Sequence, residues 1–482
     1  MGIRAVRSLG LPALLLWLCA PLAAQAPALV ADINVLPVDA GFESAVRVGS
    51  RVFFTASTDC TGTELWVSDG TPAGTRLVKD IRPFEASSSP AVMTAFGEVL
   101  VFIADDGVHG QELWRSDGTE AGTWMLRDTY PGPVAGASTI SAQGGMLAVL
   151  DGHVYFNGRT PAQGRELWRS DGTQAGTVLV RDIFPGSGES SPRGITVFGG
   201  ALYFAASPST ATGFELFRSD GTSAGTSLLV DINPAANQSG MPQGRFIAVG
   251  DTLYFAGTTA AHGEELWRTD GTAAGTSLVL DISPGTTSGL TGRPWVRRSG
   301  ILYFGGANAT HGVELWRSDG TAAGTFMLLD VNPGPPSGFF GDWLVAAESY
   351  VLFGGNTPEA GVEPWTSDGT AVGTVLLRDI DAGAGPGWSL GSNRPTAVGN
   401  TVYFNGLDPA TGPELWRTDG TLAGTSIVRD LAPGPASALP LLLAVLDATV
   451  LFAATDGVGG RSLWRSDGTG PGTSLVATPD PG

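Results

Sequence analysis

The sequence predicts an all-β protein: a single large β-propeller of nine four-stranded blades (kelch-like in blade size), after an N-terminal signal peptide. The first observation is the motif Glu-Leu-Trp-x-Ser/Thr-Asp-Gly-Thr, which recurs nine times at nearly constant spacing. The second is that each repeat holds four short apolar runs bounded by Gly-rich turns, with no helical period outside segment 1–24. Four short strands in about 50 residues is the size of a propeller blade.

Two fixed distances place the strands within each repeat. An apolar run ends in Phe at a constant distance before the motif aromatic, as Phe54 before Trp66, and only the fourth repeat is longer by one position. An Asp follows the motif aromatic at a constant distance in eight repeats, as Asp80 after Trp66, whereas the gap from that Asp to the next Phe varies. Constant length predicts paired strands, and variable length predicts a loop. The motif aromatics are Trp66, Trp114, Trp168, Phe217, Trp267, Trp316, Trp365, Trp416 and Trp464.

The strands of a repeat are named A to D in chain order. Strand A is a short run that ends in Gly, B ends at the Phe, C is Glu-Leu-Trp-Arg, and D is Leu-Val-x-Asp-Ile. Nine blades exceed the usual four to eight, so an open solenoid or two separate propellers stay as alternatives. The nine units span about 36–83, 84–131, 132–185, 186–234, 235–284, 285–333, 334–381, 382–433 and 434–482.

The N-terminal residues predict export. Residues 1–24 combine Arg4 and Arg7 with an apolar stretch too short to span a bilayer and then small residues, the pattern of a secretory signal peptide. The expected location is the periplasm, the cell surface or the medium. Residues 25–35 contain a D-like run with no A, B or C strand of its own, so they are predicted to close the ring by completing the last blade.

Composition narrows the classes of partner. The chain is 42% hydrophobic, enough to build a core, and its formal charge is −19. Without Arg4 and Arg7, 25 basic residues face 46 acidic ones, so the mature charge is −21. An acidic protein repels the phosphate backbone, which argues against nucleic acid as a partner. No later segment is apolar enough for a membrane span.

At the repeated motif the sequence resembles the bacterial ELWxxDGT-repeat proteins, exported proteins whose repeats are sometimes labelled hyalin-like. The resemblance covers about residues 28 to 478. Phe217, Pro364 and Ser462 depart from the motif by replacing its Trp, Leu and Glu. The resemblance implies export and a repeat architecture, and it implies no activity.

The nine motif aspartates allow two interpretations. They could be calcium ligands, but one carboxylate and two Thr hydroxyls per motif fall short of the six to eight oxygens that calcium takes. The favoured interpretation is an Asx-type turn, in which Asp accepts backbone N–H groups and Gly adopts a positive φ. No other metal ligand set or cofactor site is predicted. The aspartates are Asp69, Asp117, Asp171, Asp220, Asp270, Asp319, Asp368, Asp419 and Asp467.

Other polar residues of the repeat are interpreted as structural. The motif Glu and the Arg that follows it in most repeats could pair, but the default expectation is solvated strand charge. His109, His262 and His311 share one position in the B–C loop and are interpreted as repeat drift, because zinc needs three or four close ligands.

Three tryptophans outside the motif predict a ligand site. Trp295, Trp343 and Trp388 lie in the D-to-B segments of blades six to eight, with Arg394 nearby. In a meander the D–A and B–C loops share one face, here called the D–A face, and all length variation falls there. Aromatics on such loops suit stacking recognition, for example of sugar rings. The competing interpretation is that these rings fill the core.

The sequence shows no single cluster of catalytic residues. The main prediction is therefore a non-enzymatic exported scaffold that binds or adheres to a glycan or an envelope protein. A propeller-type polysaccharide lyase or hydrolase is the alternative, and a calcium-stabilised structural repeat is the second alternative.

Overall fold

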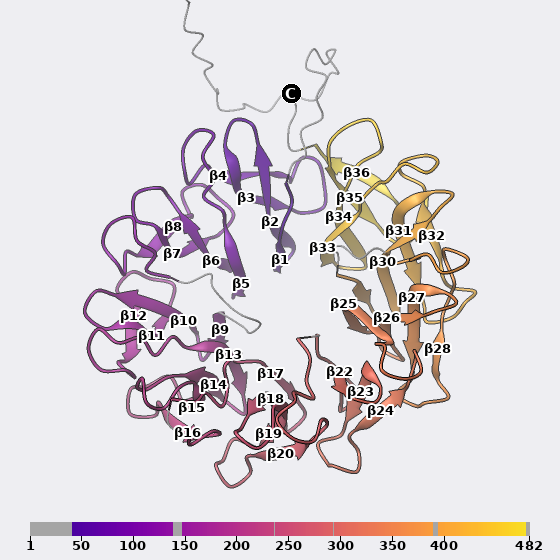
Figure 1. The fold of residues 1–482 in the computed structure, drawn as a ribbon. Coiled ribbons are helices and arrows are strands. Elements are labelled where there is room, and N and C mark those ends of the chain that lie inside the picture. The colour runs from indigo at the N-terminus through magenta and orange to yellow at the C-terminus, as the bar shows by residue number, and fades with distance from the viewer. Residues whose placement is uncertain (1–40, 138–146, 236, 293, 389–393, 479–482) are drawn as a thin grey trace, which may run out of the picture. The chain divides into compact units, whose positions relative to one another are not determined.

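Nine antiparallel sheets of four consecutive strands form the protein, as the computed structural model shows (Figure 1). The structure describes residues 41–137, 147–235, 237–292, 294–388 and 394–478, which belong to one unit. No helix occurs in these ranges, so none in them could cross a membrane. The predicted signal peptide, residues 1–24, and the predicted closing strand, residues 25–35, lie outside the described residues.

The first five blades run in chain order around the ring. They comprise β1 (Ala45–Val48), β2 (Arg51–Thr58), β3 (Gly62–Ser68) and β4 (Arg76–Lys79); β5 (Ala91–Phe96), β6 (Val99–Asp105), β7 (Gln111–Ser116) and β8 (Trp124–Arg127); β9 (Leu147–Leu150), β10 (His153–Thr160), β11 (Gly164–Ser170) and β12 (Val178–Arg181); β13 (Arg193–Phe198), β14 (Ala201–Ala206), β15 (Glu215–Ser219) and β16 (Ser227–Val230); β17 (Phe246–Val249), β18 (Thr252–Thr258), β19 (Glu264–Thr269) and β20 (Ser277–Leu280).

The last four blades complete the ring. They comprise β21 (Val296–Arg298), β22 (Ile301–Asn308), β23 (Gly312–Ser318) and β24 (Phe326–Leu329); β25 (Phe339–Ala346), β26 (Val351–Thr357), β27 (Gly361–Ser367) and β28 (Thr374–Leu376); β29 (Thr396–Val398), β30 (Thr401–Asp408), β31 (Gly412–Thr418) and β32 (Ser426–Arg429); β33 (Leu441–Leu446), β34 (Thr449–Ala454), β35 (Ser462–Ser466) and β36 (Ser474–Ala477). The predicted single propeller of nine four-stranded blades is confirmed.

The constant spacing between Phe and the motif aromatic reflects strand register. In blade one Phe54 of β2 lies directly opposite Trp66 of β3, and the equivalent residues are opposite in every blade. Strand A lies at the inner side of each blade and strand D at the outer rim (Figure 1). Blade seven carries Pro364 in place of the motif Leu and lacks the C–D bulge of the other blades. Pro has no N–H to donate, which is consistent with this local difference.

The hydrophobic core lies between neighbouring blades. Nine buried clusters each join two adjacent blades, so a blade buries one face against each neighbour. One cluster joins Val52 and Phe54 of blade one to Leu446 and Leu451 of blade nine. The ring is therefore closed by packing between its first and last blades. The alternatives of an open solenoid and of two propellers are wrong.

Five motif arginines donate to a backbone carbonyl of the following blade. The guanidinium of Arg115 donates to the carbonyl of Gly172 in the following blade, and Arg465 donates across the closure to Gly70 at 3.2 Å. The expectation of solvated charges is wrong for these arginines, because they bridge blades through backbone carbonyls. The same bond joins Arg169 to Gly221, Arg268 to Gly320, and Arg317 to Gly369.

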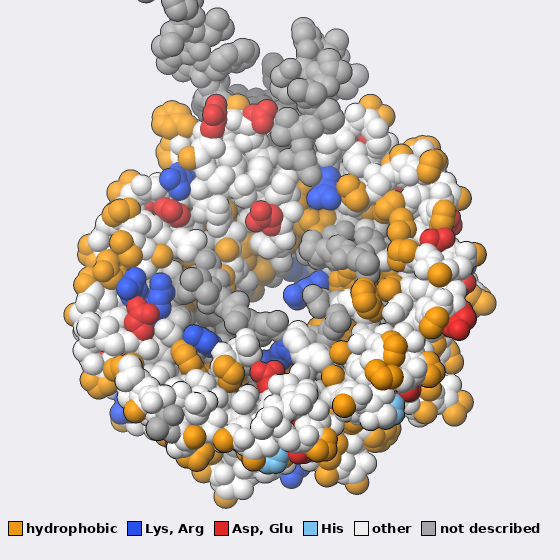
Figure 2. All heavy atoms as spheres, in the orientation of Figure 1, with side chains coloured by type: hydrophobic (Ala, Val, Ile, Leu, Met, Phe, Trp, Pro, Cys, Tyr) orange, Lys and Arg blue, Asp and Glu red, His pale blue; other side chains and the backbone are white. Residues whose placement is uncertain are grey.

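A central opening passes between the inner strands. Figure 2 shows it in the orientation of Figure 1, with several Lys and Arg side chains near its rim. On β21, Arg297 donates to the carbonyl of Ala248 at 2.8 Å, and Arg298 donates to that of Ser349 at 2.6 Å. These two arginines therefore serve contacts between blades.

Candidate functional site

The motif aspartates form closed turns. In each of the nine blades the Asp Oδ1 accepts the backbone N–H of the Thr two residues on at 2.8 to 2.9 Å. The same oxygen accepts the hydroxyl of that Thr, which lowers the pKa of Asp319, for example. A Cβ on Gly324 would lie 2.0 Å from Oδ1 of Asp319, so the second glycine is needed for close approach. This is the geometry of the predicted Asx-type turn.

No group of three or more His, Cys, Asp or Glu side chains with metal-binding geometry occurs in the described parts of the chain. His109 contacts Asp106 of its own loop at 2.7 Å, and Nε2 of His262 lies 3.8 Å from an oxygen of Asp281. The described residues therefore show no arrangement of ligands that could coordinate calcium.

The motif glutamates are fully buried, so the expectation of solvated charge is wrong for them as well. Each accepts the backbone N–H of the residue 17 positions later at 2.6 to 3.2 Å, in the segment that follows strand D. Burial raises the pKa to about 8 for Glu112 and to about 7 for the others. These glutamates are Glu64, Glu112, Glu166, Glu215, Glu265, Glu314, Glu363 and Glu414, each 0% exposed.

Two of the predicted ligand contacts belong to the core. Trp343 is 3% exposed and Trp388 is 0% exposed. Their rings stack at 5.5 Å between centroids, and Trp388 also packs on Phe404 at 5.0 Å. A ring enclosed by protein offers no face to a ligand, so the prediction of ligand contacts at these two tryptophans is wrong.

The other two predicted contacts lie apart from that pair. Trp295 is half-buried between blades five and six, and its ring packs edge-on against Phe304 at 6.5 Å. Arg394 is exposed on the segment before β29. Ligand binding at either residue stays a prediction.

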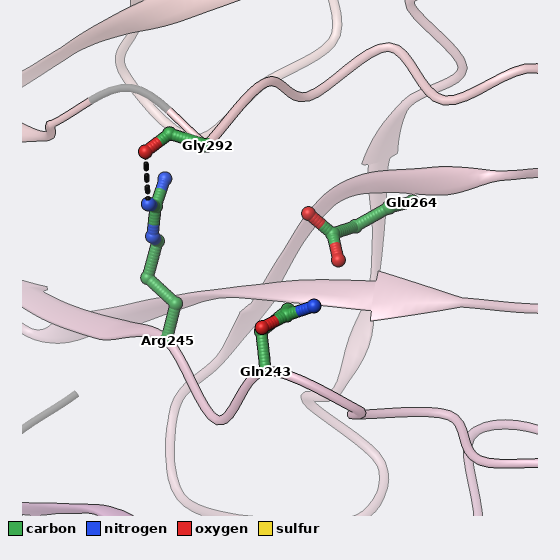
Figure 3. Close-up of a pocket in the computed structure, with 4 residues that line it drawn as sticks. All are labelled: Gln243, Arg245, Glu264 and Gly292. Atoms are coloured by element: carbon green, nitrogen blue, oxygen red, sulfur yellow. Dashed lines mark hydrogen bonds between the residues drawn. The ribbon is translucent and has the colours of Figure 1, made fainter. Parts of the chain in front are cut away.

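A polar pocket opens between blades five and six. Gln243, Arg245, Glu264 and Gly292 line a cavity of about 150 Å³ (Figure 3). Gln243 and Arg245 precede β17, Glu264 begins β19, and Gly292 precedes β21. The pocket is thus built from D–A segments and the end of a B–C loop. It lies on the predicted D–A face, one blade before the predicted position.

Arg245 is held firmly at this pocket. Its guanidinium donates to the carbonyls of Thr291 at 3.2 Å and Gly292 at 2.7 Å. Its Cζ also lies 5.2 Å from the ring centroid of Trp295, a cation–π distance. Trp295 therefore supports the pocket through Arg245.

Glu264 supplies the carboxyl group of the pocket. It is half-buried, and no hydrogen bond or ion pair joins its carboxylate to another described side chain. Burial raises its pKa, while the positive charge of Arg245 lowers it by less. Figure 3 shows the carboxylate directed toward the space between Gln243 and Arg245.

Glu264 also breaks the repeat, which is the signal that the sequence offered for this site. No other repeat has an acidic residue at the position before the motif Glu. The equivalents in the other eight repeats are Thr63, Gln111, Arg165, Phe214, Val313, Val362, Pro413 and Arg461.

Comparisons with known proteins identify similar folds only. No protein-family model and no curated protein matches the chain. Similar solved structures include a puromycin hydrolase (14% identity, TM-score 0.37, covering 78% of this chain and 57% of that chain). A prolyl endopeptidase has 14% identity and TM-score 0.40 over 78% and 53% of the two chains. A puromycin-hydrolyzing peptidase of Mycobacterium tuberculosis has 13% identity and TM-score 0.37 over 77% and 60%.

The similar structures are named as hydrolases and peptidases, so the prediction of a non-enzymatic binding or adhesion scaffold is not carried further. The chain spans between 53% and 60% of the length of those proteins. At such low identity and TM-score the likeness assigns no activity to this chain. The resemblance to ELWxxDGT-repeat proteins stays a prediction, as do export and any glycan or protein partner.

Proposed function

We propose that this protein is a hydrolase whose substrate enters the pocket between blades five and six, with Glu264 as its acid–base residue. The supporting observation is the Glu264 carboxyl, which has no hydrogen bond or ion pair to another described side chain and faces the cavity beside an amide and a guanidinium. A catalytic acid needs a pKa nearer to neutral than that of a free carboxyl, and burial shifts Glu264 in this direction.

The proposed chemistry needs one proton-transfer group and water. The Glu264 carboxyl donates its proton to the leaving group as the scissile bond breaks and water adds to the electrophilic centre. The resulting carboxylate then takes a proton from the added water, so the residue returns to its starting form. Gln243 offers donors and an acceptor to orient the substrate, and Arg245 supplies positive charge at the pocket wall.

The test is an activity screen with a matched pair of variants. The purified protein is assayed against chromogenic peptide and glycoside substrates and against polysaccharides, with unsaturated products recorded separately to detect a lyase. Glu264→Gln should lower kcat at least 100-fold, the scale of acid–base catalysis. Glu359→Gln removes an exposed carboxylate from the B–C loop of blade seven and should leave kcat unchanged.

Two results would count against the proposal. One is the absence of hydrolysis across all substrate classes at micromolar protein. The other is a Glu264→Gln variant as active as the wild type.

A further inference from the structure

A buried glutamate next to Glu264 binds the segment 282–292, which forms the pocket wall at Gly292. Glu265 is 0% exposed. Its carboxyl accepts the backbone N–H groups of Ile282 at 2.9 Å, Ser283 at 3.3 Å and Gly289 at 2.8 Å. These donors lie in the segment 282–292, which connects β20 to β21 and ends at the pocket residue Gly292.

The same segment is held against the backbone beside Glu265. The carbonyl of Glu264 accepts the N–H groups of Gly289 at 3.1 Å and Leu290 at 3.0 Å. The N–H of Glu264 donates to the Ser288 hydroxyl at 3.0 Å. A Cβ on Gly289 would lie 2.4 Å from Glu265 Oε2, so only glycine permits this approach. Residues 282–290 therefore depend on Glu265 for their position.

Charged groups surround this carboxyl on several sides. Burial raises the pKa of Glu265 to about 7 even though its N–H donors lower it, and the like charge of Asp281, just after β20, is a smaller raising cause. Asp281 in turn faces His262 at 3.8 Å. Glu264 is its chain neighbour, and Arg245 lies across the cavity. Oε1 of Glu265 accepts two of these N–H groups and Oε2 accepts one. A protonated carboxyl can still accept these three hydrogen bonds.

We propose that Glu265 is a proton-linked latch that holds residues 282–290 closed and so positions the pocket wall at Gly292, and that loss of its proton releases the segment. It is a positioning residue, because it acts on the pocket through the backbone. The functional consequence rests on the proposed hydrolase site, whereas the latch itself does not.

The direction of the effect follows from proton linkage. In the closed state the carboxyl keeps its proton up to a pH of about 7, and in water its pKa is near the ordinary value of 4.5. Between these values the closed state binds a proton that the open state has lost, so rising pH favours opening. The difference corresponds to an opening equilibrium that increases by about 100-fold across this range.

Hydrogen–deuterium exchange of the full chain tests the latch without a substrate. Exchange of residues 282–292 is followed from pH 5 to pH 8.5 and corrected for intrinsic rates. The wild type should open more by one to two orders of magnitude as pH rises. Glu265→Gln cannot ionise, so its opening should be independent of pH. Glu166→Gln removes the equivalent group of blade three, which binds Ile183, Phe184 and Ser190, and should leave the response of 282–292 intact.

Opening that is constant or that falls with pH in the wild type would overturn the latch, as would a Glu265→Gln variant that keeps the wild-type response. The wild-type series decides the question even where a variant fails to fold. Because exchange is read without substrate, a pH-dependent segment in a protein that hydrolyses nothing would refute the proposed function and leave the latch standing.

Discussion

Replacement of Trp388 by Ala tests the assignment of this residue to the core. The ring is 0% exposed and lies against Trp343 and Phe404 at centroid distances of 5.5 and 5.0 Å. Truncating a buried Trp to Ala costs about 3–5 kcal/mol through lost transfer energy and the cavity left behind. The indole Nε1 is buried and has no hydrogen-bond partner among the described residues, so its removal offsets part of that cost. The expected loss is about 4 kcal/mol of unfolding free energy.

Urea unfolding monitored by circular dichroism measures this loss. Trp124→Ala is the control, because Trp124 on β8 is 40% exposed and packs mainly under Arg115, with Cζ 4.5 Å from its ring. That variant should lose about 1 kcal/mol. A Trp388→Ala variant that loses no more than the Trp124→Ala control would refute the core assignment and return Trp388 to the candidate contacts.

Three further predictions follow from the described contacts. Asp319→Ala leaves the Thr321 N–H without its acceptor and should lower the free energy of unfolding in urea by about 1 kcal/mol. A calcium chelator should leave the wild-type Tm unchanged, and a large drop in Tm with chelator would favour calcium binding instead. Arg465→Ala removes the bond to Gly70 across the closure and should cost about 1 kcal/mol of unfolding free energy, and Arg169→Ala, which removes the equivalent bond within the ring, should cost about as much. An unchanged urea midpoint for Arg465→Ala would show that the closure bond does not stabilise the ring. Stability should fall as pH rises from 4.5 to about 7, because the buried glutamates keep in the folded state a proton that the unfolded chain has lost; a Tm that rises over this range would contradict it.

The fold was accessible from sequence because register leaves a periodic trace. The separation of Phe54 from Trp66 is the length of a B–C hairpin in which these two side chains are opposite, and the same separation recurs around the ring. Closure of the ring could also be predicted, because nine equivalent blades each need two neighbours to bury both faces. The burial of the motif Glu could not be predicted, because its hydrogen-bond partners lie 17 and 24 residues later in the D–A segment.

The site was harder to predict for a different reason. Trp343 and Trp388 break the repeat in the same way as an exposed binding residue would, and only the ring geometry shows that they stack on each other. Glu264 breaks the repeat by one carboxylate, a signal that becomes visible when the nine repeats are aligned position by position. What the alignment cannot supply is the approach of Gly292 to Arg245, whose guanidinium donates to the Gly292 carbonyl at 2.7 Å.

A crystal structure of the Glu264→Gln variant soaked with a substrate from the activity screen would show directly whether substrate binds in the pocket beside residue 264. We expect substrate density in the cavity between blades five and six, within hydrogen-bond distance of side chain 264 and of Gln243 or Arg245. Density confined to the central opening, or to the D–A loops of other blades, would contradict it.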